Sequence, residues 1–321
     1  MQVMPRETME TESNHTLLTE FVLVGFTRDP FLQTIFLVLF LASYTLTMTG
    51  NLGLMTLICL DSHLHTPMYF FVGNLSFLDV WYSTVYTPRI LFDCISRDKA
   101  MSLAGCAAQF FFSAGLAYSE CFLLAAMAYD RYVAICSPLL YATAMPWKLC
   151  VQLVTGCYLI GFANAVIHTG NTFRLHFCGS NVIDHFFCDA PPLVKMACED
   201  TRVYELLLAA VIGCNVLATT ILILGSYAGI AAAITGIRSA TGRRKALSTC
   251  SAHLVSVSLF YGSILLMYCR PSSQRTPAWD KANALFYTVV NPLVNPLIYS
   301  LRNKDVKSAS RKVLGRFIAP K

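Results

Sequence analysis

Charged residues are scarce in this chain. Only 13% of its 321 residues are charged, whereas 55% are hydrophobic and the mean hydropathy is +0.55. Soluble domains carry about 25% charged residues, so the composition excludes a water-soluble fold of this size and predicts lipid as the solvent. The formal net charge of +6 is modest, and no long basic run occurs outside the C-terminal end. These features argue against nucleic acid as a partner.

Two further absences narrow the architecture. The first residues, MQVMPRETMETESNHTLL, contain neither the basic nor the apolar region of a cleavable signal peptide, so we expect the first membrane helix to direct export. No repeat relates the two halves of the chain, which gives no support to the inverted-repeat plan of many transporters. We therefore expect function to reside in the helices, their loops and a short tail.

Long apolar runs are what the chain has instead. A membrane-spanning helix needs roughly 20 predominantly apolar residues. Seven segments meet this requirement, namely Phe31–Leu60, Met68–Phe92, Leu103–Cys136, Trp147–Ile167, Val203–Ile234, Ala246–Cys269 and Ala282–Leu301. The second and seventh are more polar than the others, which indicates positions that face the bundle. The prediction is an all-α integral membrane protein, with a seven-transmembrane helix bundle over residues 31–301.

Charge and glycosylation signals set the expected orientation. Basic residues crowd the short loop from Arg238 to Lys245, and seven more follow Ser300, as is typical of cytoplasmic segments. An N-glycosylation acceptor begins at Asn14, whereas a second one, at Asn74, falls within a span. We expect a plasma-membrane protein with residues 1–30 as an extracellular glycosylated tail and residues 302–321 as a cytoplasmic tail.

The C-terminal tail itself predicts a short amphipathic helix. Apolar residues alternate there with basic ones, at Leu301, Val306, Val313, Leu314 and Phe317. Such a helix lies on the inner leaflet with its basic side chains toward anionic lipid.

An acid and a base follow one of the most apolar runs of the chain. Asp130-Arg131-Tyr132 comes after FLLAAMAY, and 25 residues separate Cys106 from Arg131. That separation is about 37 Å of helix at ~1.5 Å per residue, so the pair lies at the cytoplasmic mouth if Cys106 lies at the outer surface. An acid beside an arginine can hold it in one conformation until a competing partner releases it.

The order of the motifs carries a family resemblance. Gly50-Asn51 comes first and LHTPMYFFVGNLSFLD follows at Leu64–Asp79. The later motifs are MAYDRYVAICSPL at Met127–Leu139, Ser226-Tyr227, KALSTCSAHL at Lys245–Leu254, FYG at Phe260–Gly262 and PLVNPLIYSLRN at Pro292–Asn303. With these motifs the chain resembles the rhodopsin-like G-protein-coupled receptors, and within them the olfactory receptors.

The resemblance implies a receptor rather than an enzyme, one that raises cAMP through a heterotrimeric G-protein of the olfactory stimulatory type. It implies that Arg131 engages the G-protein while Asp130 restrains it at rest. Asn295, Pro296 and Tyr299 match the family's switch in the seventh span. The rest of the expected coupling set is Tyr132, Tyr227 and Lys245. A purely structural ion pair and an ordinary proline kink are the alternatives.

Two carboxyl groups are expected at membrane depth, where ionisable residues are functional candidates. The resemblance places Asp79, Glu120 and Asn295 around a central polar cluster. Two carboxylates this close either bind a cation, such as sodium, or share a proton. A protonated structural pair and a proton-transporting pair stay open at this point, and no other cofactor is expected.

Three cysteines occupy the long loop FCGSNVIDHFFCDAPPLVKMAC. An exported loop favours disulfides, but spacing leaves the connectivity open. The resemblance pairs Cys106 with Cys188 and Cys178 with Cys198. We expect no metal at His185, because a cysteine engaged in a disulfide cannot ligate as a thiolate.

The ligand pocket is expected in the outer half of the bundle, beneath this loop. Positions shortly before Glu120 on the third span, together with alignment to the family, give a predicted lining of Ser113, Ala117, Tyr118, Val211, Asn215, Tyr261, Tyr268, Leu285 and Thr288. The set is mainly apolar, with a few hydroxyls and one amide, which favours a small neutral volatile ligand. Each member has helix packing as its alternative role. Two alternative functions stay open, a chemosensor of the same family outside the olfactory epithelium and an ion or proton transporter using Asp79 and Glu120.

Overall fold

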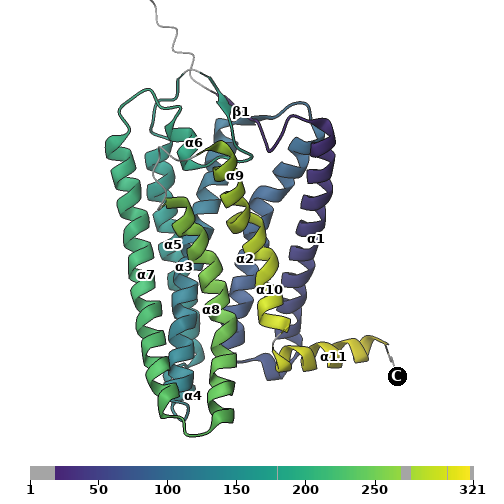
Figure 1. The fold of residues 1–321 in the computed structure, drawn as a ribbon, viewed down its shortest axis with the longest axis vertical. Helices are drawn as coiled ribbons and strands as arrows, with labels where there is room; N and C mark the ends of the chain where they lie inside the picture. Colours follow the sequence, from purple (N-terminus) through teal and green to yellow (C-terminus); the bar gives the residue numbers. More distant parts are fainter. Residues whose placement is uncertain (1–18, 179, 269–275, 302, 319–321) are drawn as a thin grey trace, which may run out of the picture.

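A computed structural model describes residues 19–178, 180–268, 276–301 and 303–318 (Figure 1). Within these ranges, seven long helical segments lie side by side. They are α1 (Pro30–Leu60), α2 (Pro67–Ile95), α3 (Leu103–Cys136), α5 (Trp147–Thr172), α7 (Arg202–Gly236), α8 (Ala240–Tyr268) and the continuous run of α9 (Pro277–Leu285), the π-helical η3 (Phe286–Val290) and α10 (Asn291–Leu301). The seven predicted spans are confirmed, each within six residues at either end.

Local sequence explains where several of these helices begin. The Asp29 side chain accepts hydrogen bonds from the backbone N–H groups of Phe31 and Leu32, at 2.8 and 3.1 Å, and Pro30 occupies the first turn of α1. Thr276 and Pro277 repeat this arrangement at α9. A side-chain cap satisfies amide groups that have no partner within the helix, and proline has no amide hydrogen to satisfy there.

The third span is the centre of the bundle. α3 packs against α2, α5, α7 and α8, and Leu116 and Leu124 are fully buried along it. By contrast α1 and α7 expose leucines, with Leu39 58% and Leu224 64% accessible. Apolar surface on this scale is a membrane-facing surface rather than a water-facing one. By length and hydropathy α1, α3, α5, α7 and α8 qualify as spans, while α2 and α9–α10 are the more polar pair, as predicted.

A small sheet above the helices has no counterpart in the sequence predictions. β1 (Glu20–Leu23) lies in its middle, antiparallel to β2 (Ala100–Ser102) and parallel to β3 (Val182–Ile183). The strand buries Phe21 and Leu23 completely. Part of the expected N-terminal tail is therefore built into the loops at this end of the bundle, while the glycosylation acceptor Asn14 lies outside the described residues.

The predicted amphipathic helix is present as α11 (Lys304–Ile318). It runs at 87° to the seventh span (Figure 1). Val306 and Ala309 are buried against the bundle, and Lys312 Nζ lies 3.5 Å from Asp61 Oδ2. Asp61 follows α1 and precedes the short helix η1 (Ser62–Leu64). Hydrogen bonds from the His63 backbone and ring, with a smaller contribution from Lys312, lower the pKa of Asp61 to about 2, so this carboxylate stays charged. The side chains of Leu301, Leu314 and Phe317 lie outside the described ones.

Candidate functional site

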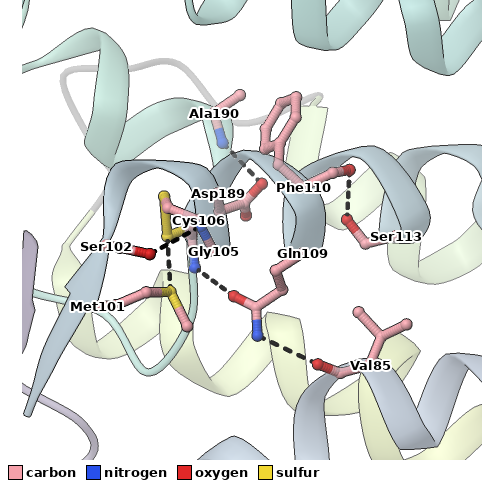
Figure 2. Close-up of a disulfide and its surroundings, with 11 residues drawn as sticks. Val85, Met101, Ser102, Gly105, Cys106, Gln109, Phe110, Ser113, Asp189 and Ala190 are labelled. Carbon is pink, nitrogen blue, oxygen red and sulfur yellow. Dashed lines mark hydrogen bonds between the residues drawn. A yellow bond between two sulfur atoms is a disulfide. The ribbon is translucent and has the colours of Figure 1, made fainter. Parts of the chain in front are cut away.

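Two disulfides hold the loop that covers one end of the bundle. Cys106 at the start of α3 is bonded to Cys188, and Cys178 to Cys198, so both expected pairings are confirmed. Figure 2 shows a second tie that the sequence did not reveal. Gln109 Oε1 accepts from the Cys188 backbone N–H at 3.0 Å, and its Nε2 donates to the Val85 carbonyl of α2 at 3.2 Å. One amide side chain thus joins the loop to α2 and α3.

His185, within the same loop, is held by packing. Its ring stacks on Phe186 with centroids 4.7 Å apart and meets the edge of Phe187 at 4.4 Å. Its backbone carbonyl accepts from Gly25, just after β1. Burial, together with the positive charge of Lys281, lowers the pKa of His185 to about 3. Among the described residues no cluster of three or more His, Cys, Asp or Glu side chains is arranged for a metal ion.

The predicted ligand residues of α3 lie on its inward side. Ser113 and Tyr118 are both 8% exposed and Ala117 is half-buried. Ser113 donates to the Phe110 carbonyl at 2.9 Å, so its hydroxyl hydrogen is engaged within the helix (Figure 2). The Tyr118 hydroxyl lies 3.4 Å from Nδ1 of His168 on α5. His168 was not among the predicted site residues.

Tyr261 joins three helices through a polar cluster. Its hydroxyl donates to Thr219 Oγ1 of α7 at 2.7 Å, and Cys121 Sγ of α3 lies 3.2 Å from the same hydroxyl. All three side chains are buried. Cys121 lies within the apolar run of α3, and these polar contacts were not predicted. Thr219, which the predictions omit, completes the cluster.

Asn215 is engaged with α5 rather than free. It donates to Asn164 Oδ1 at 3.0 Å, and the reciprocal bond from Asn164 is 3.4 Å long. Val211, one turn earlier, lines a small cleft between α5 and α7.

The predicted residues of the seventh span occupy its first half. Thr288 is buried and donates to the Ala284 carbonyl at 2.8 Å, while Leu285 packs on the main core. The side chain of Tyr268 lies outside the described ones. The structure therefore places most of the predicted lining on helices that face one another.

The central polar cluster brings Asp79 and Asn295 together. Asn295 Nδ2 lies 3.2 and 3.1 Å from the two Asp79 carboxylate oxygens, and Ser256 donates to Asn295 Oδ1 at 2.9 Å. Glu120 is 7% exposed, and its buried Oε1 has no hydrogen-bond partner among the described residues. A buried acceptor without a donor suits either a cation or a shared proton.

The acid–base pair lies buried at the opposite end of α3 from the disulfide. Asp130 and Arg131 are 1% and 3% exposed, and Arg131 Nη1 lies 3.3 Å from Asp130 Oδ2. The other carboxylate oxygen accepts from the Tyr141 hydroxyl at 2.7 Å. Tyr141 begins α4 (Tyr141–Ala144) in the following loop and was not predicted. Burial raises the pKa of Tyr141 and the Asp130 charge raises it further, so the phenol keeps the proton that it donates.

The buried His253 connects α7 and α3, the helices that carry the predicted coupling residues Tyr227 and Arg131. His253 of α8 lies 2.8 Å from the Tyr227 hydroxyl of α7 through Nδ1, and 3.0 Å from the Leu124 carbonyl of α3 through Nε2. The predictions include Tyr227 but omit His253, although it lies within the motif KALSTCSAHL. Tyr132 packs against Gly229, whose position has no room for a side chain. The side chain of Lys245 lies outside the described ones.

The motif of the seventh span packs closely against the first span. A Cβ atom at Gly50 would lie 3.1 Å from Pro296 Cγ, and Asn51 donates to the Pro292 carbonyl at 3.0 Å. Small residues allow such close approach between membrane helices. Tyr299 is buried one turn beyond Asn295.

Comparison with known proteins gives a consistent set of similarities. A protein-family model described as olfactory receptor matches residues 40–316. Human Olfactory receptor 9G4 is 63% identical over 299 residues, which cover 93% of this chain and 91% of that relative. Mouse Olfactory receptor 9G19 is 57% identical over 303 residues, covering 94% and 99%. The crystal structure of squid rhodopsin is similar in fold, with a TM-score of 0.71 and 17% identity over 88% of this chain and 80% of that one.

Proposed function

The chain belongs to the olfactory receptor family of seven-transmembrane G-protein-coupled receptors, and from this premise we propose that it detects small, mostly neutral volatile molecules and raises cAMP through the olfactory stimulatory G-protein. Members of this family are multi-pass membrane proteins that signal and do not catalyse a reaction. In the proposed orientation the disulfide-linked loop is extracellular, α11 lies on the inner leaflet of the plasma membrane, and Asn14 is glycosylated.

The observation that carries the coupling proposal is the state of the Asp130 carboxylate. Both of its oxygens have donors, Arg131 on one side and Tyr141 on the other. Arg131 is thereby held inside the bundle beside the cytoplasmic loops. A partner that binds the Arg131 guanidinium must break its contact with this carboxylate, which then loses one of its two donors. That is the arrangement expected of a restraint on a G-protein contact.

The ligand end of the proposal rests on the helices that the Tyr261 cluster joins. A ligand in contact with Tyr261 bears on α3, α7 and α8 at once, because Thr219 and Cys121 share hydrogen bonds with that hydroxyl. His253 joins the same three helices nearer the coupling end. Displacement of Tyr261 is therefore expected to change the packing of α8 against α3, and so the surroundings of Arg131.

We further propose that the central polar cluster tunes activation. Asp79 and Glu120 supply carboxylate oxygens suited to a sodium ion, Asn295 holds Asp79 by donating to it, and the orphaned Glu120 Oε1 supports this fit. When bound, the ion would neutralise the buried carboxylates. In the Glu120→Gln variant we expect signalling to persist while its dependence on sodium is lost. A complete loss of signalling at normal surface level would favour an obligatory acid–base role instead.

The experiment for the main proposal is a cAMP assay in cells that display the protein together with the olfactory stimulatory G-protein, across a panel of volatile compounds. A dose-dependent rise for some compounds, absent from cells without the receptor, is the expected result. No rise from a well-displayed receptor with that G-protein, together with a response through a different G-protein, would contradict the coupling.

A further inference from the structure

α10 and α11 meet at a sharp corner (Figure 1). The axes of the seventh span and α11 differ there by 87°. Asn303 lies between the two helices, and its Oδ1 accepts from the backbone N–H groups of Asp305 and Val306 at 2.9 and 3.3 Å. An asparagine that satisfies these otherwise free amides caps the helix. The start of α11 therefore depends on how the Asn303 side chain is held.

Tyr69 connects this cap to α2. It lies in the first turn of α2 and is 4% exposed. Its hydroxyl is 3.0 Å from Asn303 Oδ1 and 3.2 Å from Asp305 Oδ2, and Asn303 Nδ2 donates to it at 2.8 Å. A phenol hydroxyl has one hydrogen, so it donates to one of these two oxygens at a time while it accepts from the amide. We call Tyr69, Asn303 and Asp305 the corner cluster.

The corner cluster adds to the polar contact that Asp79 and Asn295 make between α2 and α10. The ten residues from 69 to 79 span about 15 Å of helix at ~1.5 Å per residue. α10 is thus held to α2 at membrane depth, and the residue that follows α10 is held again at the end of the bundle that carries α11. A displacement of this end of α10 away from α2 must break the contact between Asn303 and Tyr69.

A movement of α8 reaches the corner cluster through Asn295. Ser256 of α8 donates to Asn295 Oδ1 at 2.9 Å. Asn295 belongs to α10, which ends two residues before Asn303. Under the proposed function, α8 changes its packing against α3. Such a change acts on α10 through this hydrogen bond, and α10 in turn acts on the contact between Asn303 and Tyr69.

The other contacts within the described part of α11 hold it weakly. Val306 and Ala309 are buried, but these two side chains cover little apolar surface. The Lys312 side chain is 46% exposed and pairs with Asp61 at 3.5 Å, and exposed ion pairs contribute little to stability. A helix of 15 residues is only marginally stable by itself. Loss of the corner cluster is therefore expected to loosen α11 as a whole.

We propose that Tyr69 is a positioning residue for coupling. Its hydroxyl holds the cap of α11 against α2 while Arg131 is restrained, and this contact opens when α8 displaces α10, so that α11 is released from its docked position. The inference rests on the proposed coupling function, because it makes the hold on α11 respond to agonist. A purely structural contact would hold α11 equally with and without agonist.

Hydrogen–deuterium exchange of the full-length receptor in nanodiscs, read by peptide mass spectrometry, measures how firmly α11 is held. Tyr69→Phe removes the hydroxyl and keeps the ring. Without agonist, we expect the amides of residues 305–313 to exchange about fivefold faster in this variant than in the wild type, as for the loss of one hydrogen bond. An agonist from the cAMP panel is expected to raise the wild-type rate toward that of Tyr69→Phe and to leave the variant's rate unchanged.

Tyr44→Phe is the matched control, because the Tyr44 hydroxyl of α1 contacts Thr84 at 3.4 Å rather than the corner cluster. It should leave exchange in α11 at the wild-type rate. Equal exchange in α3 for all three proteins separates loss of the contact from misfolding. Unchanged α11 exchange in Tyr69→Phe, or in the agonist-bound wild type, would overturn the proposal. The comparison without agonist uses no G-protein, so a failure of cAMP coupling would leave its result standing.

Discussion

At the residue scale, the proposed restraint on Arg131 depends on the number of hydrogen-bond donors that contact the Asp130 carboxylate. Asp130 is 1% exposed and is shared between Arg131 and Tyr141. A hydrogen bond to a charged group contributes about 1.5–3 kcal/mol, so the phenol is a large part of what keeps this carboxylate in place. Tyr141 therefore acts as a positioning residue for the pair.

Replacing Tyr141 with Phe removes that donor and keeps the ring. We expect basal cAMP to rise about fivefold at equal surface display, because loss of the bond frees Asp130 and with it Arg131. Tyr129→Phe, at a tyrosine of α3 that is 44% exposed, is the control and should leave basal cAMP unchanged. Basal signalling that stays at the wild-type level in Tyr141→Phe would remove Tyr141 from the restraint.

His185 predicts a pH dependence of stability. Its pKa is lowered to about 3 by burial and by Lys281, whereas an unfolded histidine titrates near 6.5. Stability from the neutral ring is fully present above pH 6.5. It is lost as the pH falls toward 3, by at most about 1.4 kcal/mol per pH unit, because only the unfolded chain takes up the proton.

The measurement is the apparent Tm of the receptor in nanodiscs between pH 7.5 and 4.5. We expect the acid-induced fall to be shallower in His185→Leu than in the wild type. His176→Gln, at a histidine whose side chain is 87% exposed, should behave as the wild type does. Parallel curves for the wild type and His185→Leu would show that burial of the neutral ring is not what makes the receptor acid-sensitive.

Sequence reasoning at this scale succeeded for residues with unusual chemistry at an unusual depth. Asp79, Glu120, Asp130 and Arg131 are conspicuous because charge is rare in apolar runs. Asp79 and Glu120 are buried as expected, whereas the Asp130–Arg131 pair, expected at the mouth of the bundle, is also buried. Tyr141, His253, Thr219 and Gln109 were missed because their roles arise from partners on other helices. Which side chains meet across helices depends on helix rotation and loop path, and neither is written in the local pattern.

At the scale of elements, the contact between α3 and α5 depends on a glycine. A Cβ atom at Gly161 would lie 2.7 Å from the Ser119 backbone nitrogen and 2.8 Å from the Gly115 carbonyl oxygen. Backbone atoms cannot move aside as a flexible side chain can. The two helices approach this closely only because position 161 has no side chain, as in other small-residue contacts between membrane helices.

Gly161→Ala is therefore expected to destabilise the bundle by about 1–3 kcal/mol, the usual cost of overpacking. Gly156→Ala on the same helix meets nothing within 4 Å and should be neutral or slightly stabilising, because alanine has the higher helix propensity. Surface display and apparent Tm of the two variants are the measurements. Equal Tm values for Gly161→Ala and Gly156→Ala would contradict the packing account.

The spans themselves were predictable because a bilayer imposes one length and one polarity on every helix that crosses it. The sheet formed by β1, β2 and β3 was not. Its strands are two to four residues long, too short for a periodic pattern, and they pair across a large separation in sequence. The N-terminal tail was likewise predicted from composition. Composition does not reveal that residues 20–23 form a strand that pairs with the loops.

At the scale of the whole molecule, α3 joins the two ends of one bundle. The disulfide-linked loop and the predicted lining lie at one end, and the Asp130–Arg131 pair lies at the other, with α3 running between them. The Tyr261 cluster and His253 tie α3 to α7 and α8 along the way. Under the proposed function, a signal from ligand to G-protein is expected to change the packing of α8 against α3.

The most direct test is guanine-nucleotide exchange on the purified olfactory stimulatory G-protein, catalysed by the receptor in nanodiscs with an agonist from the cAMP panel. We expect agonist to accelerate exchange by the wild type and Arg131→Ala to abolish the acceleration. Binding of the agonist should remain intact in that variant. Acceleration of exchange by Arg131→Ala to the wild-type level would contradict the central claim that the buried Asp130–Arg131 pair controls coupling.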